Sequence, residues 1–142
     1  MNNKQIQLVQ ESFEQVKPIA NVAATLFYSR LFKLDPTLRP YFKADLSEQK
    51  QKLITALAFV VAGLNRPDTI LPAVRELGQR HVGYGVQPQH YETVGAALLW
   101  TLEQGLGDQF TDEVRVAWTA AYDLLSSVMQ EATQPALALA VE

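Results

Sequence analysis

The stretch Leu77–Tyr91, LGQRHVGYGVQPQHY, contains both histidines of this 142-residue chain. Val74, Leu77 and His81 are spaced by three and four residues, so they share one face of a predicted helix. An apolar helix face of this kind normally points into a protein core. We therefore expect His81 to point inward at the end of its helix, with Gly78 one turn before it.

An inward histidine has two interpretations, and the residues alone leave both open. It can be a buried side chain bonded to a carbonyl, or it can be a metal ligand. The chain has no cysteine and no His-x-x-x-His spacing, and a lone histidine cannot build a tetrahedral zinc site. His81 could still hold a metal whose other ligands come with a cofactor, as haem iron does. His90, beside Pro88 in the first turn of the next predicted helix, is expected to be exposed and inert.

The apolar residues recur at intervals of three and four along the whole chain, which predicts helices rather than strands. The length suits a single domain over residues 1–142. The tail, residues 135–142, could extend the last helix or fray. We expect six or seven helices, over residues 6–16, 18–32, 35–42, 45–63, 69–81, 88–105 and 111–133.

The composition limits the possible partners and cofactors. Without cysteine there are no disulfides, thiolate metal sites or cofactors attached through thioethers. The net charge is −3 and the basic residues are scattered, whereas nucleic-acid binding normally leaves a basic patch. No apolar run approaches the ~20 residues that span a bilayer, and no secretory signal is apparent. We expect a soluble, cytoplasmic protein that is a monomer or a weak homodimer.

The pattern LGQRH…GV…HY..VG..LL..L, followed by AW..AY, resembles the globins. It is most similar to single-domain bacterial haemoglobins and to the globin domain of flavohaemoglobins, and the resemblance covers about residues 6–133. It implies a globin fold around a haem pocket, with His81 as the proximal iron ligand. Because Cys-x-x-Cys-His is absent, the implied cofactor is non-covalent haem b.

The resemblance also implies a polar distal pocket. In bacterial haemoglobins the tyrosine that matches Tyr28 donates a hydrogen bond to the iron's ligand, and a glutamine on the long helix assists it. Gln49 is the candidate for this glutamine. The segment before this helix is about three residues shorter than in flavohaemoglobins, so Gln51 or Lys52 could take this place instead.

Five further residues are implied to contact the haem. Phe42 matches the phenylalanine that packs against the haem at the corner after the short third helix. Leu53 follows Gln49 on the same helix face, and Val86 follows the proximal histidine. Lys52 and Arg80 could pair with the haem propionates, or they could be ordinary solvated charges.

Tyr91 matches a tyrosine that supports the proximal histidine in this family. A partner on the second imidazole nitrogen fixes its tautomer and raises its basicity. The family completes this arrangement with a glutamate near the end of the last helix. Alignment on Trp118 and Tyr122 places Thr133 at that position, and Glu131 lies roughly 200° away around the helix.

The implied function is reversible binding of oxygen and related diatomic molecules by ferrous haem. The alternative is nitric oxide dioxygenation, for which the chain would need a separate reductase. A third class, a sensor or light-harvesting protein with the same fold, would use cysteine-linked chromophores or an output domain, and the sequence shows neither.

Overall fold

The computed structural model describes the backbone of residues 1–83 and 86–141, and the side chains of residues 1–81 and 86–132. These ranges contain six α-helices, three short 3-10 segments and no β-strand. The elements are α1 (Asn3–Val16), η1 (Lys17–Ile19), α2 (Ala20–Leu34), η2 (Pro36–Tyr41), α3 (Ser47–Ala62), α4 (Pro67–Gly83), α5 (Pro88–Leu106), η3 (Gly107–Gln109) and α6 (Asp112–Val141). The prediction of an all-α fold with six or seven helices is confirmed.

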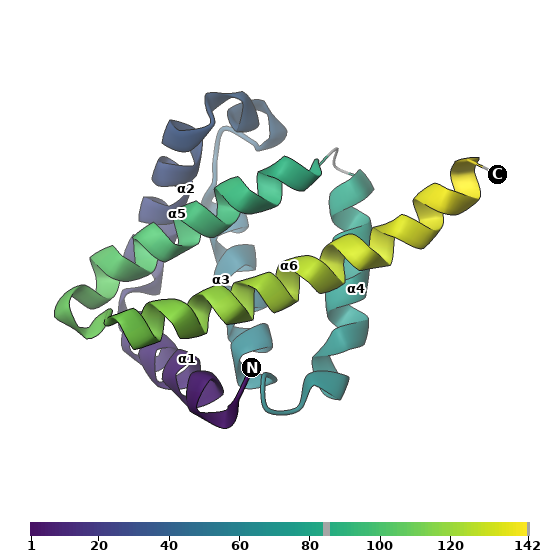
Figure 1. Ribbon diagram of the computed structural model, residues 1–142. Coiled ribbons are helices and arrows are strands. Elements are labelled where there is room, and N and C mark those ends of the chain that lie inside the picture. The colour runs from purple at the N-terminus through teal and green to yellow at the C-terminus, as the bar shows by residue number, and fades with distance from the viewer. Residues whose placement is uncertain (84–85, 142) are drawn as a thin grey trace.

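Three helix–helix contacts dominate the fold. α6 packs against both α1 and α4, and α2 packs against α5. Figure 1 shows α6 crossing α4 and extending beyond it at the C-terminal end. α3 packs against α1 and α2, but within the described residues it hardly contacts α4, which follows it in sequence. The two helices are thus held in place from different sides of the fold.

The first and last helices meet in the core through a buried polar contact. Trp118 Nε1 donates a hydrogen bond to Ser12 Oγ at 2.8 Å, and both residues are buried. Ser12 Oγ in turn donates to the Leu8 carbonyl at 2.7 Å. The Phe13 ring packs beside Trp118 with 6.3 Å between centroids. Because both polar groups have partners, their burial carries little penalty.

The start of α4 and the end of α6 are among the helix boundaries that differ from the sequence prediction. α4 begins at Pro67 rather than at Thr69, which lies inside the helix and donates to the Arg66 carbonyl at 2.7 Å. Proline at the first helical position loses no hydrogen bond, so Pro67 starts the helix. Pro72 consequently lies beyond the first turn. α6 runs to Val141, so residues 135–141 continue the helix.

None of the helices in the described part of the chain is long and apolar enough to cross a bilayer.

α4 and α6 pack closely at Gly78. A Cβ atom at this position would lie 2.7 Å from Met129 Cα and closer still to the Met129 carbonyl oxygen. Backbone atoms cannot move away as a flexible side chain would. Glycine is therefore required here for α4 to pack directly on the backbone of α6.

We expect Gly78→Ala to lower the free energy of unfolding by about 1–3 kcal/mol, because overpacking forces the two helices apart. Gly105→Ala is the matched control, since its Cβ would meet only Ile19 Cδ1, at 3.4 Å. Alanine in a helix stabilises by up to about 1 kcal/mol relative to glycine. Urea unfolding followed by circular dichroism compares the two variants. Equal midpoints would contradict the close packing at Gly78.

Candidate functional site

His81 lies in the last turn of α4 and is half-buried. Its Nδ1 is 2.7 Å from the Leu77 carbonyl, and because a carbonyl only accepts, Nδ1–H is the donor. Burial lowers the pKa of the imidazole, and the hydrogen bond to Leu77 partly opposes this change. The Val86 backbone N–H donates to the His81 carbonyl at 3.0 Å. The imidazole is therefore held neutral and fixed in one tautomer, which is the form that binds metals.

The described residues contain no group of three or more histidine, aspartate, glutamate or cysteine side chains that could hold a metal ion. A metal bound at His81 would have to bring its remaining ligands with it. With Nδ1 bonded to Leu77, Nε2 is the nitrogen that would bind it. This donor set fits a planar metal cofactor with one protein ligand.

Tyr28 is the central buried polar residue of α2, with 4% of its surface exposed. Its hydroxyl lies 3.5 Å from the Gln49 backbone carbonyl at the start of α3. Burial raises the pKa of the phenol, and a hydrogen bond with the Gln49 side chain partly opposes this change. The hydroxyl consequently stays protonated and can act as a hydrogen-bond donor.

An aromatic cluster surrounds the Tyr28 ring. Phe27 and Phe42 meet it edge-on at 5.0 and 5.6 Å between centroids, and Phe32 packs at 6.1 Å. Phe32 also meets Phe42 at 5.5 Å. Phe42 is thus placed next to Tyr28, in contact with two rings of α2.

The first turns of α3 distinguish the three candidates for the distal polar residue. Gln49 is half-buried beside Tyr28. The Gln51 side chain is exposed and donates to Asn21 at 3.4 Å. Lys52 pairs with Glu48 at 3.5 Å on the outer surface. Of these three, only Gln49 lies beside the buried tyrosine.

Several apolar side chains pack against the core but are only partly buried. They come from α2, the turn after η2, α3, α4, the turn before α5, and α5 itself. They are Phe32, Phe42, Leu53, Leu57, Leu77, Val86 and Val94. Because α3 and α4 share few contacts in the described residues, these side chains are candidates to pack against a flat apolar cofactor.

Tyr91 is buried at the start of α5, and burial raises the pKa of its hydroxyl. Its carbonyl accepts a hydrogen bond from the Tyr122 hydroxyl at 2.6 Å. The Tyr122 ring packs directly on Gly95, where a Cβ atom would lie 2.8 Å from the ring. Tyr122 therefore fixes the backbone from which Tyr91 projects. Burial, with smaller contributions from Tyr91 and Asp123, raises the pKa of Tyr122.

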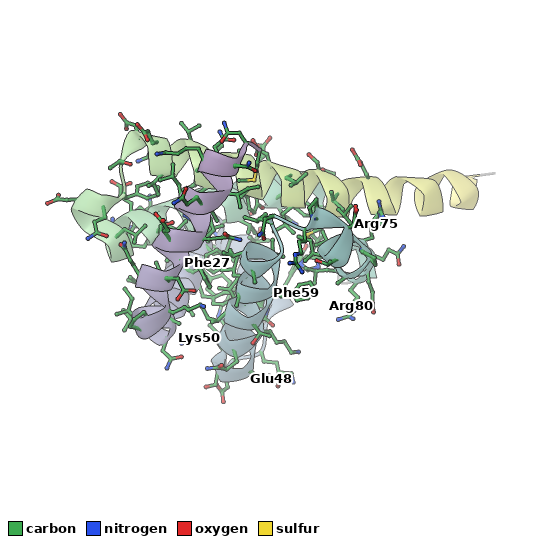
Figure 2. All side chains as sticks on the ribbon, turned by 90° about the horizontal axis from the view of Figure 1, so that it is seen from below. Phe27, Glu48, Lys50, Phe59, Arg75 and Arg80 are labelled. Carbon is green, nitrogen blue, oxygen red and sulfur yellow. The ribbon has the colours of Figure 1, made fainter. Side chains whose placement is uncertain are left out.

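The remaining predicted positions lie outside this arrangement or outside the described side chains. Arg80 pairs with Glu76 at 2.6 Å, and both are exposed on α4. Figure 2 shows Arg80 on the outside of α4 and Glu48 on the outside of α3. Glu131 is exposed on α6. The Thr133 side chain lies outside the described residues.

The prediction that His90 is exposed is wrong. Only 8% of its surface is exposed, and its Nδ1 accepts a hydrogen bond from the Gln87 backbone N–H at 2.9 Å. The Tyr41 ring packs edge-on against it at 5.7 Å. His90 occupies the third position of α5 and bonds back to the helix start, as glutamate or glutamine does in a capping box. The sequence contained a signal for this role, because His90 lies three residues after Gln87, at the spacing of a capping box.

An all-helical fold with a fixed histidine in the last turn of α4 fits the helical haem proteins that use one proximal histidine. The comparison with known families agrees, because the Globin family model matches residues 25–129. The chain therefore belongs to the globin family.

Several bacterial flavohemoproteins are similar to this chain over their globin region. That of Rhizobium meliloti is 32% identical over 106 residues, which cover 72% of this chain and 26% of the relative. That of Bacillus subtilis is 29% identical over 130 residues, covering 89% of this chain and 32% of the relative. The chain thus spans about a quarter to a third of the length of these relatives.

Solved structures give the same fold. An engineered carbene transferase from Rhodothermus marinus, described as a candidate nitric oxide dioxygenase, superposes with a TM-score of 0.88 at 25% identity. The superposition covers 100% of this chain and 99% of that one. A bacterial globin from Campylobacter jejuni superposes with a TM-score of 0.84 at 21% identity, covering 96% and 99% of the two chains.

Proposed function

We propose that this globin holds haem b non-covalently through His81 and binds oxygen and other diatomic molecules reversibly. The observation that supports this most directly is the His81 imidazole, which is kept neutral by burial and oriented by the Leu77 carbonyl. Ferrous haem supplies the reversible binding of the diatomic ligand. The residues of the chain supply the proximal nitrogen, the apolar enclosure and a distal hydrogen-bond donor.

Tyr28 is proposed as the distal donor, assisted by Gln49. Its buried hydroxyl keeps its proton because burial disfavours the phenolate. A donor at this position would stabilise negative charge on a bound diatomic ligand, which is the role proposed for the Tyr28 hydroxyl. Phe42, Leu53 and Val86 are proposed to pack against the haem faces and exclude water.

On the proximal side, Tyr91 is proposed to support His81, with its backbone held by Tyr122. Lys52 and Arg80 remain proposed partners of the haem propionates. For this role each would have to exchange its exposed glutamate partner, Glu48 or Glu76, for a propionate. Such exposed pairs contribute little stability, so the exchange costs little.

We expect His81→Gly to lose stoichiometric haem and its Soret band, because the proximal nitrogen is missing. Added imidazole should restore both, since it supplies the same nitrogen without a covalent link to α4. His90→Gln is the matched control and should retain the wild-type spectrum. Absorption spectra of the ferric and ferrous proteins provide the measurement. An unchanged spectrum in His81→Gly would remove this histidine from the site.

We expect Tyr28→Phe to release oxygen about ten- to a hundredfold faster, which corresponds to losing a hydrogen bond to a charged group. The variant retains the ring and its packing with Phe27 and Phe42. Stopped-flow displacement of oxygen by carbon monoxide measures the rate. A wild-type rate in Tyr28→Phe would show that the donor lies elsewhere.

Nitric oxide dioxygenation is the second candidate, favoured by the flavohemoprotein relatives and by the Rhodothermus marinus neighbour. Oxygen and nitric oxide would combine to give nitrate and leave the iron ferric. One electron must then be returned, and we propose that a separate reductase provides it.

Rapid mixing of the oxygenated protein with nitric oxide should convert it to the ferric form with one nitrate produced per haem. Sustained nitrate production should then require an added flavin reductase and reduced nicotinamide cofactor. A single turnover that never repeats, even with reductase in excess, would leave oxygen binding as the function.

A further inference from the structure

Arg39 forms a hydrogen-bonded clamp on the turn between η2 and α3. Its Nη1 donates to the carbonyl oxygens of Phe42 at 3.2 Å and Lys43 at 3.0 Å, and its Nη2 donates to that of Ala44 at 3.1 Å. Lys43 and Ala44 are themselves exposed. One half-buried side chain thus satisfies three consecutive carbonyls that would otherwise depend on solvent.

The same guanidinium group also contacts the aromatic cluster around Tyr28. Arg39 Cζ lies 5.2 Å from the centroid of the Phe32 ring, over its face. Phe32 packs on both Tyr28 and Phe42, and Phe42 packs on Tyr28. Arg39 therefore holds Phe42 in two ways, through its backbone carbonyl and through the neighbouring ring.

The clamped turn leads directly into the helix that carries Gln49. Asp45 accepts a hydrogen bond from the Ser47 backbone N–H at 2.9 Å, and α3 begins there. Gln49 lies in the first turn of α3, with its carbonyl 3.5 Å from the Tyr28 hydroxyl. Few residues separate the turn from Gln49, so a shift of the turn displaces the start of α3 relative to Tyr28.

We propose that Arg39 is a positioning residue that sets how long a diatomic ligand is retained, by fixing Phe42 and Gln49 relative to Tyr28. This inference rests on the proposed function. The role requires the planar, multi-donor guanidinium group. A lysine ammonium group keeps the charge, but it is a compact point charge on a flexible stem and cannot span three carbonyls in the same way.

The test compares Arg39→Met and Arg39→Lys with Arg75→Met. Arg75 is exposed on the outside of α4, so its replacement removes the same charge far from the clamp (Figure 2). We expect both Arg39 variants to release oxygen about three- to tenfold faster, as for the loss of an ordinary hydrogen bond. Arg75→Met should keep the wild-type rate.

Two further readouts separate positioning from a general loss of stability. If Arg39 acts through Tyr28, adding Arg39→Met to Tyr28→Phe should change the release rate less than about twofold, because the two effects are coupled. The C–O stretching frequency of the carbon monoxide complex should shift in Arg39→Met toward the value of Tyr28→Phe. A purely structural role would lower the unfolding temperature and leave this frequency unchanged.

The outcomes distinguish this inference from the proposed function. Wild-type release rates and C–O frequencies in both Arg39 variants would overturn the role of Arg39, while haem binding and the Tyr28 effect would still support oxygen binding. Wild-type behaviour in Arg39→Lys alone would overturn the carbonyl clamp. If Arg39→Met does not fold, the Arg39→Lys rate decides. Failure of the wild-type protein to bind haem would end both proposals.

Discussion

The packing of α4 on α6 at Gly78 is the constraint on which the candidate site depends. Because α4 lies directly on the backbone around Met129, it takes its position from α6. α3 takes its position from α1 and α2. The two helices that flank the site therefore take their positions mainly from other helices rather than from each other. A rigid helix on each side lets side chains such as His81 be held without support from the ligand.

Burial has complementary effects on the two polar residues of the site. Desolvation always disfavours the charged form of a group. For His81 it lowers the pKa, so the imidazole is neutral and its second nitrogen has a lone pair for a metal. For Tyr28 it raises the pKa, so the hydroxyl keeps its proton and can donate. The same physical effect thus provides an electron-pair donor on α4 and a hydrogen-bond donor on α2.

The sequence correctly predicted those features of the fold that follow from a periodic pattern of apolar residues. The three- and four-residue spacing of Val74, Leu77 and His81 predicted one helix face, and all three lie on α4 as expected. The sequence could not show which residue of α3 faces Tyr28, because Gln49, Gln51 and Lys52 all lie in one polar stretch at the start of this helix. The structure distinguishes them by their contacts. Gln49 lies beside Tyr28, Gln51 bonds to Asn21, and Lys52 forms an ion pair within α3.

Two further features of the molecule, His90 and Arg39, could not be predicted from periodicity, for different reasons. His90 was expected to be exposed because polar residues in a first helical turn usually are, yet its bond to Gln87 and its contact with Tyr41 bury it. Arg39 could not have been identified, because its acceptors are backbone carbonyls, which no sequence pattern marks. Hydrogen bonds between a side chain and the backbone of a turn can be identified only from the three-dimensional structure.

If His81 holds haem as proposed, its hydrogen bond to the Leu77 carbonyl favours ligand retention over redox chemistry. A carbonyl such as that of Leu77 carries less negative charge than a carboxylate, so it raises the basicity of the imidazole less. In the resembling family a glutamate strengthens this effect, and here the sequence has Thr133 at the aligned position. Tyr91 remains, with its carbonyl bonded to Tyr122. In the proposed function, weaker electron donation from His81 would favour the ferrous state that reversible ligand binding requires.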